Sequence, residues 1–217
     1  MPDDASDRSL VLAHTVVARP PLVPELSLRL VTEACPLWRA TEADLEKLGL
    51  PEPFWAFAWP GGQALARHVI DHPELARARR VLDFGSGCAV EAIAAARAGA
   101  ACVLAADIDP LACEAASLNA ALNGVALETT CRDLVGLDEG WDLVLVGDMF
   151  YEAALAERLA DWLSRLAARG ATVLVGDPNR GFFDAARAER LAEYDAPADV
   201  DVAGRYRRAT AVFRILR

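Results

Sequence analysis

The sequence predicts an α/β fold of the Rossmann-like, doubly wound type, in which helices cover both faces of a mostly parallel sheet. From residue 80 onward, short apolar runs alternate with helical patterns, as parallel strands and their crossover helices do. One of these runs leads into an acid and two closely spaced glycines, at residues 81–88, a turn that lets the main chain approach a ligand. The length of 217 residues suits one such domain with an N-terminal addition.

Six segments have the apolar character of strands, at residues 80–84, 102–106, 127–131, 142–146, 171–175 and 207–216. Helical patterns occupy residues 41–48, 62–71, 90–98, 111–123, 153–168 and 182–192. Thr41 and Asp44 have the spacing of a capping pair at the start of the first helix. The last strand alternates polar and apolar residues, so we expect it to run antiparallel after a hairpin near residues 192–196.

The N-terminal part of the chain differs from the rest. Residues 1–60 are punctuated by prolines and lack the alternation of strands and helices that begins later. We therefore divide the chain into an N-terminal accessory segment, residues 1–60, and an α/β domain, residues 61–217.

The charge of the chain limits its partners and its location. The formal net charge is −10, whereas a nucleic-acid grip needs a basic stripe, so we expect no nucleic acid and favour a basic macromolecular partner. No stretch is long enough to span a membrane, and the acidic N-terminal residues do not resemble a signal peptide. We expect a cytoplasmic monomer without a membrane partner.

Cysteine and histidine spacing gives no sign of a metal site. The five cysteines, at positions 35, 88, 102, 113 and 131, show no Cys-x-x-Cys pair, and the three histidines are scattered. We expect reduced, buried, structural thiols and no bound metal.

The glycine turn indicates the class of ligand. Gly85, Ser86 and Gly87 leave room for a ligand at the start of the next helix. Dinucleotide enzymes have a third glycine where this chain has Val90, and Asp83 would repel a diphosphate but suits a ligand with an ammonium group. The Asp-x-Gly-x-Gly pattern resembles class I methyltransferases, which bind S-adenosylmethionine. The alternative is a glycine turn in another doubly wound protein.

Further acids follow the predicted strands. Asp107 comes 24 residues after Asp83, close to the distance at which a carboxylate holds a ribose diol, and we place Ile108 beside it in the cofactor site. Asp109 precedes a proline and has the pattern of a helix N-cap. The resemblance implies that Asp133 accepts a hydrogen bond from the adenine amino group.

Three aromatic residues and one acid suggest an acceptor site. Asp148, Phe150 and Tyr151 follow the fourth predicted strand; the carboxylate suits an amine acceptor, and a ring face suits a sulfonium or the product cation. Alternatively, Phe150 and Tyr151 are core aromatics. Trp59 either flanks the cofactor or anchors the N-terminal segment. We predict Asp148, Tyr151 and Phe150 as catalytic residues, with Asp148 and Trp59 also beside the cofactor.

With these motifs the chain resembles the seven-strand protein lysine methyltransferases, most closely the electron transfer flavoprotein beta subunit lysine methyltransferase family. The resemblance covers roughly residues 50–185 and rests on the following segments: Phe54 to Phe57, Trp59 to Leu65, Asp83 to Cys88, Asp107 to Pro110 with Asn119 and Asn123, and Asp148 to Tyr151. It implies a class I methyltransferase fold with a doubly wound seven-stranded sheet and an antiparallel last strand. It also implies methyl transfer from S-adenosylmethionine, leaving S-adenosylhomocysteine, to lysines of that flavoprotein subunit.

One position departs from the family pattern. The turn of the family continues Gly-Cys-Gly, whereas this chain has Ala89 in the last place. We expect alanine to be tolerated there because we place it in the first turn of the helix.

Three other functions remain open at this stage. The same sheet and acids would serve a small-molecule N-methyltransferase acting on nicotinamide-like amines. A ribosomal-protein methyltransferase is a second alternative, although the N-terminal domain with which such enzymes dock is missing or short. A binding module that has lost turnover is the third.

Overall fold

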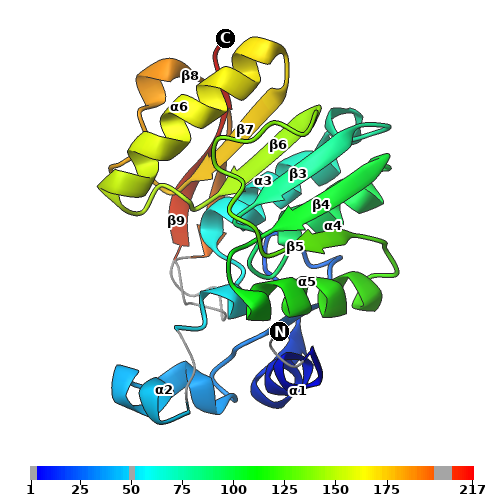
Figure 1. Ribbon diagram of the computed structural model, residues 1–217, viewed down its shortest axis with the longest axis vertical. Helices are drawn as coiled ribbons and strands as arrows, with labels where there is room; N and C mark the ends of the chain where they lie inside the picture. The colour runs from blue at the N-terminus through cyan, green and yellow to red at the C-terminus, as the bar shows by residue number, and fades with distance from the viewer. Residues whose placement is uncertain (1–3, 49–51, 198–206) are drawn as a thin grey trace.

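A seven-stranded sheet forms the centre of this computed structural model (Figure 1), which describes residues 4–48, 52–197 and 207–217. The strand order is β5-β4-β3-β6-β7-β9-β8. The bounds are β3 Arg80–Phe84, β4 Cys102–Ala106, β5 Glu128–Thr130, β6 Leu143–Gly147, β7 Thr172–Asp177, β8 Ala188–Pro197 and β9 Arg207–Ile215. This is the predicted doubly wound sheet of seven strands.

The direction of the strands brings their functional ends together. β3 to β7 pair in parallel, whereas β9 pairs antiparallel with both β7 and β8, which confirms the prediction for the last strand. The carboxyl ends of the parallel strands therefore lie at one edge of the sheet. Chain order reverses around β3, whose neighbours are β4 and β6, and ligands of such sheets bind in the crevice at this reversal.

Helices cover both faces of the sheet because its strands are buried on both sides. Val81 packs into the cluster formed with α3 Pro60–Asp71 and α4 Val90–Arg97, which α5 Pro110–Leu122 joins through Ala116. Leu82, its neighbour in the strand, packs into the cluster of α6 Ala153–Arg169 on the other face. Figure 1 shows α6 alone in front of the sheet.

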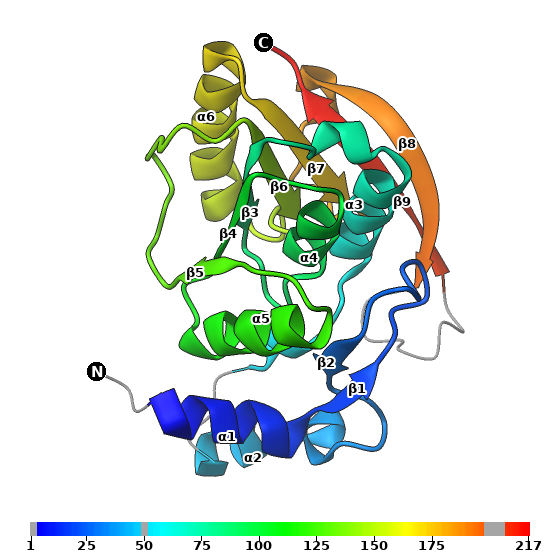
Figure 2. The same cartoon turned by 90° about the vertical axis from the view of Figure 1, so that its right-hand side faces the viewer.

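The N-terminal elements lie beneath α5, at the end of the molecule opposite to the C-terminus (Figure 2). They comprise α1 Asp4–His14, β1 Val16–Ala18, β2 Leu28–Leu30, η1 Pro36–Arg39, α2 Glu42–Leu48 and η2 Phe54–Ala56. Apolar side chains of α1, η1, α2 and η2 share one cluster with Leu111 and Leu118 of α5, whereas Leu28 and Leu30 of β2 pack into the cluster of α3 and α4. The amide side chains of Asn119 and Asn123 accept hydrogen bonds from the backbone of Arg29 and Ser27. The accessory segment is therefore joined to the domain by both apolar and polar contacts.

Most predicted elements are confirmed within a few residues, including the reciprocal capping of α2 by Thr41 and Asp44 and the N-cap of α5 by Asp109. The predicted helix at residues 182–192 is wrong. A short 3-10 turn, η4 Ala185–Arg187, leads there into the edge strand β8. The residues favour a helix locally, but four of them, Ala188, Glu189, Arg190 and Ala192, pair with β9, and this pairing overrides local propensity. The hairpin expected near residues 192–196 is also wrong, because these residues lie within β8 and pair with β9. The connection between the two strands, residues 198–206, lies outside the described residues.

The cysteine prediction is correct only in part. None of the five cysteines forms a disulfide, and Cys35, Cys88 and Cys113 are buried, but Cys102 and Cys131 are exposed. Each of these two lies at an end of its strand, Cys102 as the first residue of β4 and Cys131 directly after β5. Strand ends emerge from the helical cover, so an apolar sequence context does not guarantee burial there.

Candidate active site

The glycine turn joins β3 to α4 and has three residues in the left-handed region. Gly85 and Gly87 have φ of +71° and +47°, which only glycine adopts at little cost. Ala89 follows with φ 61° and ψ 31°, as the N-cap of α4 rather than in its first turn. The expectation that Ala89 takes an ordinary helical conformation is therefore wrong, because the helix begins one residue later.

Two side chains contact this turn. A Cβ at Gly85 would collide with the side chain of Met149, which lies against the turn. The backbone N–H of Gly87 donates to Asp107 Oδ2 over 2.9 Å. Met149 thus links the glycine turn to the segment that follows β6, and Asp107 links it to the end of β4.

Asp83 lies below the turn rather than in it. Its side chain has no exposed surface, and Oδ2 accepts a hydrogen bond from the backbone N–H of Ala92 over 2.9 Å. Glu91 is a hydrogen-bonded neighbour, itself only 3% exposed. Burial raises the pKa of Asp83 to about 6, and burial together with the charges of Asp83 and Asp148 raises the pKa of Glu91 well above its ordinary value. The contact between these two buried carboxyl groups joins the end of β3 to the first turn of α4.

Asp107 and Ile108 follow β4 at the mouth of the crevice. Asp107 Oδ1 accepts from the backbone N–H of Asp109 over 3.0 Å, and burial raises the pKa of Asp107 despite these hydrogen bonds. Ile108 is 73% exposed. An apolar side chain that is so exposed beside a glycine turn is suited to cover a flat apolar ring.

Asp133 lies farther out, beyond β5. Its Oδ1 accepts from the backbone N–H of Val135 and its Oδ2 pairs with Arg158 at 2.9 Å. The Val135 hydrogen bond and the guanidinium lower the pKa of Asp133. The carboxylate is therefore ionised and solvated, and each oxygen keeps a lone pair for a further donor such as an amino group.

Asp148 is the most constrained acid of the group. It follows β6 with φ of +58° and its side chain is 9% exposed. Oδ2 accepts from the backbone N–H of Gly62 over 3.0 Å, and Oδ1 pairs with Arg180 at 3.1 Å. Burial raises the pKa of Asp148 to about 6, although Arg180 and the N–H groups of α3 act against it. Asp148 thus joins the start of α3 to the loop after β7.

Trp59 is the N-cap of α3 and borders the same place. Its indole nitrogen donates to the backbone oxygen of Phe54 over 2.8 Å, and the guanidinium carbon of Arg180 lies 5.7 Å from its ring centre. Arg180 therefore lies between an aromatic face and the Asp148 carboxylate. Trp59 both anchors the residues that precede α3 and contributes to this corner of the site.

The two aromatic residues after Asp148 have different surroundings. Phe150 is 2% exposed and its ring packs edge-on against Phe183, with 4.9 Å between centroids. Tyr151 is 54% exposed. Burial and the charges of Glu152 and Asp107 raise its pKa, so its hydroxyl stays protonated. The structure leaves Tyr151 accessible to an acceptor and makes Phe150 a core residue.

The residues around the glycine turn fit the expected methyl donor. Met149 fills the space over Gly85, but the space over Gly87 is open, because the nearest atom to a Cβ there would be Trp55 Cα at 3.7 Å. Three acids, Asp83, Asp107 and Asp148, lie around the turn. The Ser86 hydroxyl is buried without a hydrogen-bond partner. Unpaired buried hydroxyls are rare in proteins, so the Ser86 hydroxyl is available to a polar group of a ligand. The three acids suit the cation and the hydroxyl groups of that ligand. Among the described residues, no group of three or more His, Cys, Asp and Glu side chains is placed to hold a metal ion.

The sequence assigned no role to four residues that build the site: Glu91, Met149, Arg180 and Gly61. A Cβ at Gly61 would collide with the backbone oxygen of Gly176. The pair of glycines after Pro60 was the available signal, because adjacent glycines at a helix start indicate close backbone contact. No local pattern distinguishes Arg180 from the many other arginines.

Comparison with known proteins gives concordant results. Residues 64–177, just over half of the chain, match the family model described as ribosomal protein L11 methyltransferase (PrmA). The chain is 48% identical over 179 residues to the electron transfer flavoprotein beta subunit lysine methyltransferase of Xenopus laevis, covering 81% of this chain and 72% of that protein. The corresponding protein of Danio rerio is 42% identical over 201 residues, covering 89% and 77%.

A solved structure has the same fold. Magnesium protoporphyrin IX methyltransferase (ChlM) from Synechocystis PCC 6803, with bound SAM, superposes with a TM-score of 0.51 at 18% identity and covers 71% of this chain and 80% of its own. At this identity the similarity concerns the fold alone. It agrees with the class I methyltransferase architecture expected from the motifs.

Proposed function

We propose that this chain, which belongs to the electron transfer flavoprotein beta subunit lysine methyltransferase family, transfers methyl groups from S-adenosylmethionine to lysine side chains of that subunit. It is an S-adenosylmethionine-dependent protein-lysine N-methyltransferase, and it releases S-adenosylhomocysteine. The net charge of −10 suits a protein substrate whose methylated region is basic.

One observation of the structure carries the proposal. The segment from Asp148 to Tyr151 touches both halves of the expected reaction. Met149 lies against Gly85 in the glycine turn, while Tyr151, two residues later, remains exposed. A donor bound over the turn and an amine beside Tyr151 would therefore be neighbours. Alignment of the two reactants is the main contribution that an enzyme makes to an in-line displacement.

We assign roles to the site residues on this basis. Bound S-adenosylmethionine supplies an electrophilic methyl group on a sulfonium. Gly85, Ser86 and Gly87 cradle it, Asp107 holds the ribose, and Asp83 fixes the turn from below.

Ile108, Trp59 and Asp133 form the outer border of this cofactor site. Ile108 covers the adenine and Asp133 accepts from its amino group. Trp59 closes the side next to Arg180.

On the acceptor side, Tyr151 receives the lysine amine. Asp148 is ionised above pH 6 and keeps Arg180 and α3 in place. Phe150 supports Tyr151 from the core. The amine must lose its proton before it attacks. Because Tyr151 is exposed, solvent takes this proton, and the positive charges of Arg180 and the sulfonium favour the neutral amine.

The function is tested with purified protein, S-adenosylmethionine carrying a labelled methyl group, and the recombinant flavoprotein beta subunit. We expect label in lysines of the subunit, located by mass spectrometry, and no label when the subunit is omitted. A subunit that stays unlabelled under conditions where S-adenosylmethionine binds would contradict the substrate assignment.

The match to the ribosomal protein L11 methyltransferase model supports a second candidate substrate. Ribosomal protein L11 is therefore tested as an acceptor in the same assay. Nicotinamide-like small-molecule amines are tested in parallel. Label in L11 or in a small molecule alone would transfer the assignment to that acceptor. Absence of S-adenosylmethionine binding in calorimetry would indicate a binding module without turnover.

We also propose that the protein is a cytoplasmic monomer that binds neither membranes nor nucleic acid. Among the described residues, none of the helices is both long and apolar enough to cross a bilayer. Cell fractionation tests the compartment, and light scattering of the purified chain tests the monomer.

A further inference from the structure

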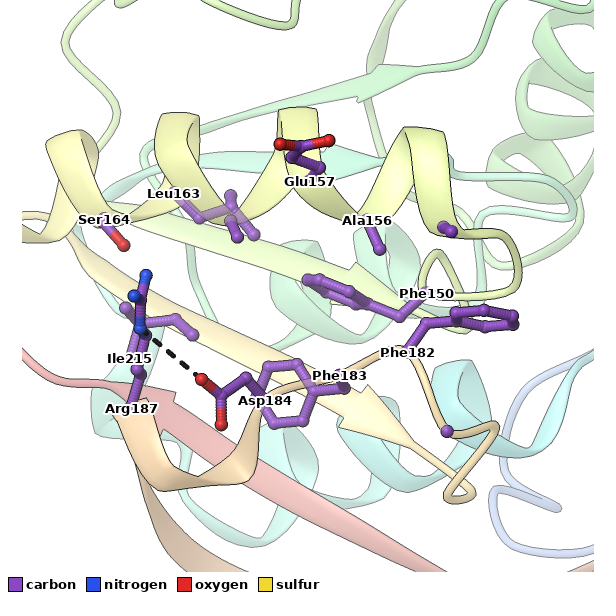
Figure 3. A pocket seen from close by; sticks show the side chains of 13 residues that line it. Phe150, Ala156, Glu157, Leu163, Ser164, Phe182, Phe183, Asp184, Arg187 and Ile215 are labelled. Carbon is purple, nitrogen blue, oxygen red and sulfur yellow. Dashed lines mark ion pairs between the residues drawn. The ribbon is translucent and has the colours of Figure 1, made fainter.

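A groove of about 370 Å³ lies between α6 and the segment 181–187, on the face of the sheet that α6 covers (Figure 3). Phe150, Leu163, Phe183 and Ile215 contribute apolar side chains to it. Phe150 and Phe182 lie at one end, and Ser164 and Arg187 lie at the other. None of the roles assigned to the donor site uses this space.

The groove begins where the acceptor site ends. Phe150 lines the groove and immediately precedes Tyr151 in the chain. Phe182, at the same end, is 45% exposed although it is a large apolar residue. Exposed apolar surface beside a reaction site indicates contact with a partner. A chain that presents an amine to Tyr151 would therefore continue over Phe182 into the groove.

The length and charge of the groove restrict its occupant. Ala153 and Ser164, which line it from α6, are separated by 11 helical residues, or about 16 Å, which matches about five residues of extended chain. Glu157 is exposed on the rim and forms no ion pair within the described part of the chain, whereas Asp184 pairs with Arg187 at 3.5 Å. The rim therefore carries one negative charge without a counter-charge, which favours a basic side chain.

We propose that this groove is the docking site for an extended segment of the protein substrate next to the methylated lysine. The segment inserts at least one apolar side chain between Leu163 and Phe183 and places a basic residue beside Glu157. The inference rests on the proposed function for the identity of the substrate. The chemistry of the segment, apolar and basic residues in alternation, follows from the groove itself.

Two variants test the groove, each with a matched control on the same helix. Ala160→Trp fills the groove, and Ala168→Trp adds the same bulk to an exposed position outside it. Glu157→Lys reverses the rim charge, and Asp161→Lys makes the same change at an exposed acid that does not line the groove. Because Glu157 is exposed, its variant keeps the test valid if Ala160→Trp does not fold.

Binding is measured first, with two fluorescein-labelled pentapeptides, Arg-Leu-Lys-Leu-Arg and the same peptide with glycine in place of leucine. We expect the wild type to bind the leucine peptide at least tenfold more tightly than the glycine peptide. Ala160→Trp should abolish this preference, and Glu157→Lys should weaken binding about fivefold at low salt. Both controls should bind as the wild type does. Equal binding of the two peptides by the wild type would overturn the proposal.

Turnover of the flavoprotein beta subunit is measured next. We expect Ala160→Trp to raise KM at least tenfold and Glu157→Lys to raise it about fivefold. In both variants kcat should stay within twofold and S-adenosylmethionine affinity should be unchanged. A KM unaffected by both variants would overturn the docking site while leaving the proposed function intact. If the wild type binds the leucine peptide through the groove but does not methylate the subunit, the proposed substrate is wrong, while the groove remains supported as a docking site.

Discussion

At the scale of single residues, Ala89 has an unfavourable conformation at the start of α4. Its φ of 61° lies in the left-handed region, where the methyl group of an L-residue costs about 1–2 kcal/mol. Ala89→Gly removes this strain, but it also removes a buried methyl worth about 0.8 kcal/mol and adds about 0.5–1 kcal/mol of unfolded-state entropy. We therefore expect the free energy of unfolding to change by less than about 1 kcal/mol.

Ala94→Gly is the matched control for this substitution. Ala94 is also fully buried in α4, but lies in the helix interior. Glycine there loses the same methyl and about 1 kcal/mol of helix propensity without relief of strain. Urea unfolding should show Ala94→Gly to be less stable than Ala89→Gly by about 1 kcal/mol or more. Equal losses in the two variants would mean that Ala89 carries no strain in the native protein.

Tyr151 permits a test of the acceptor site without disturbance of the core. Because its side chain is 54% exposed, Tyr151→Ala should leave the melting temperature and S-adenosylmethionine affinity unchanged. We expect kcat to fall on the order of 100-fold, because the ring no longer orients the amine. Steady-state kinetics and calorimetry measure the two effects separately.

Two further variants define the role of the ring. Tyr151→Phe should keep most of the activity if the ring face is what matters, and Leu122→Ala, which shortens another exposed apolar side chain at the end of α5, should behave as the wild type. Unchanged turnover in Tyr151→Ala would exclude this residue from the acceptor site.

At the scale of elements, the start of α3 is held by contacts of backbone against backbone. A Cβ at Gly61 would overlap the backbone oxygen of Gly176, which cannot move without displacing β7. A Cβ at Gly62 would meet side chains alone, Val90 at 3.3 Å and Glu91 at 3.7 Å. Alanine at position 61 would also come within 2.6 Å of Asp148 Oδ2, so this packing and the acceptor site depend on each other.

These contacts give a prediction for a pair of adjacent glycines. Both alanine variants gain similar helix propensity, about 1 kcal/mol, but Gly61→Ala must separate α3 from the sheet. We expect Gly61→Ala to lower the free energy of unfolding by several kcal/mol and to reduce activity, and Gly62→Ala to change stability by less than about 1 kcal/mol. Thermal and urea unfolding of the two variants provide the measurement. A stable, active Gly61→Ala protein would show that α3 can shift freely.

The same elements explain how far sequence reasoning reaches. Asp107 and Asp148 could be placed at strand ends because each directly follows an apolar strand, and Asp133 because it comes three residues after the end of β5. Asp83 was expected at the ligand, but its partner Glu91 comes from a helix packed over the strand, and local sequence does not report that packing. The pair Arg180 and Trp59 is separated by 121 positions (180 − 59) and meets only in the folded sheet. Edge strand β8 was mistaken for a helix because its pairing with β9 is not local.

At the scale of the whole molecule, the site concentrates buried acids at one edge of the sheet. Asp83, Glu91 and Asp148 each expose less than 10% of their surface, and burial raises the pKa of each carboxyl group. Burial of these carboxyl groups lowers the free energy of unfolding, but their hydrogen bonds hold the glycine turn and the start of α3 in place. A charged donor bound over the turn would offset part of the cost, which links ligand binding to stability.

The raised pKa values predict how stability depends on pH without the donor. Asp83 and Asp148 have ordinary pKa values of 3.8 and native values of about 6, so the native state binds more protons than the unfolded chain in this window. Their contribution is therefore most favourable below pH 4 and is lost as the pH rises through 6. Between pH 5.5 and 7.5 we expect each to lower the free energy of unfolding by roughly 1 kcal/mol.

Asp83→Asn tests whether these buried acids cause the slope. Asparagine keeps an oxygen for the Ala92 N–H but does not ionise, so urea unfolding at pH 5.5, 6.5 and 7.5 should show a shallower loss of stability than in the wild type. Asp161→Asn, at an exposed acid on α6, should leave the slope unchanged. A wild-type protein whose stability rises across this range would contradict the raised pKa values, because acids stabilised as carboxylates in the native state produce that opposite slope.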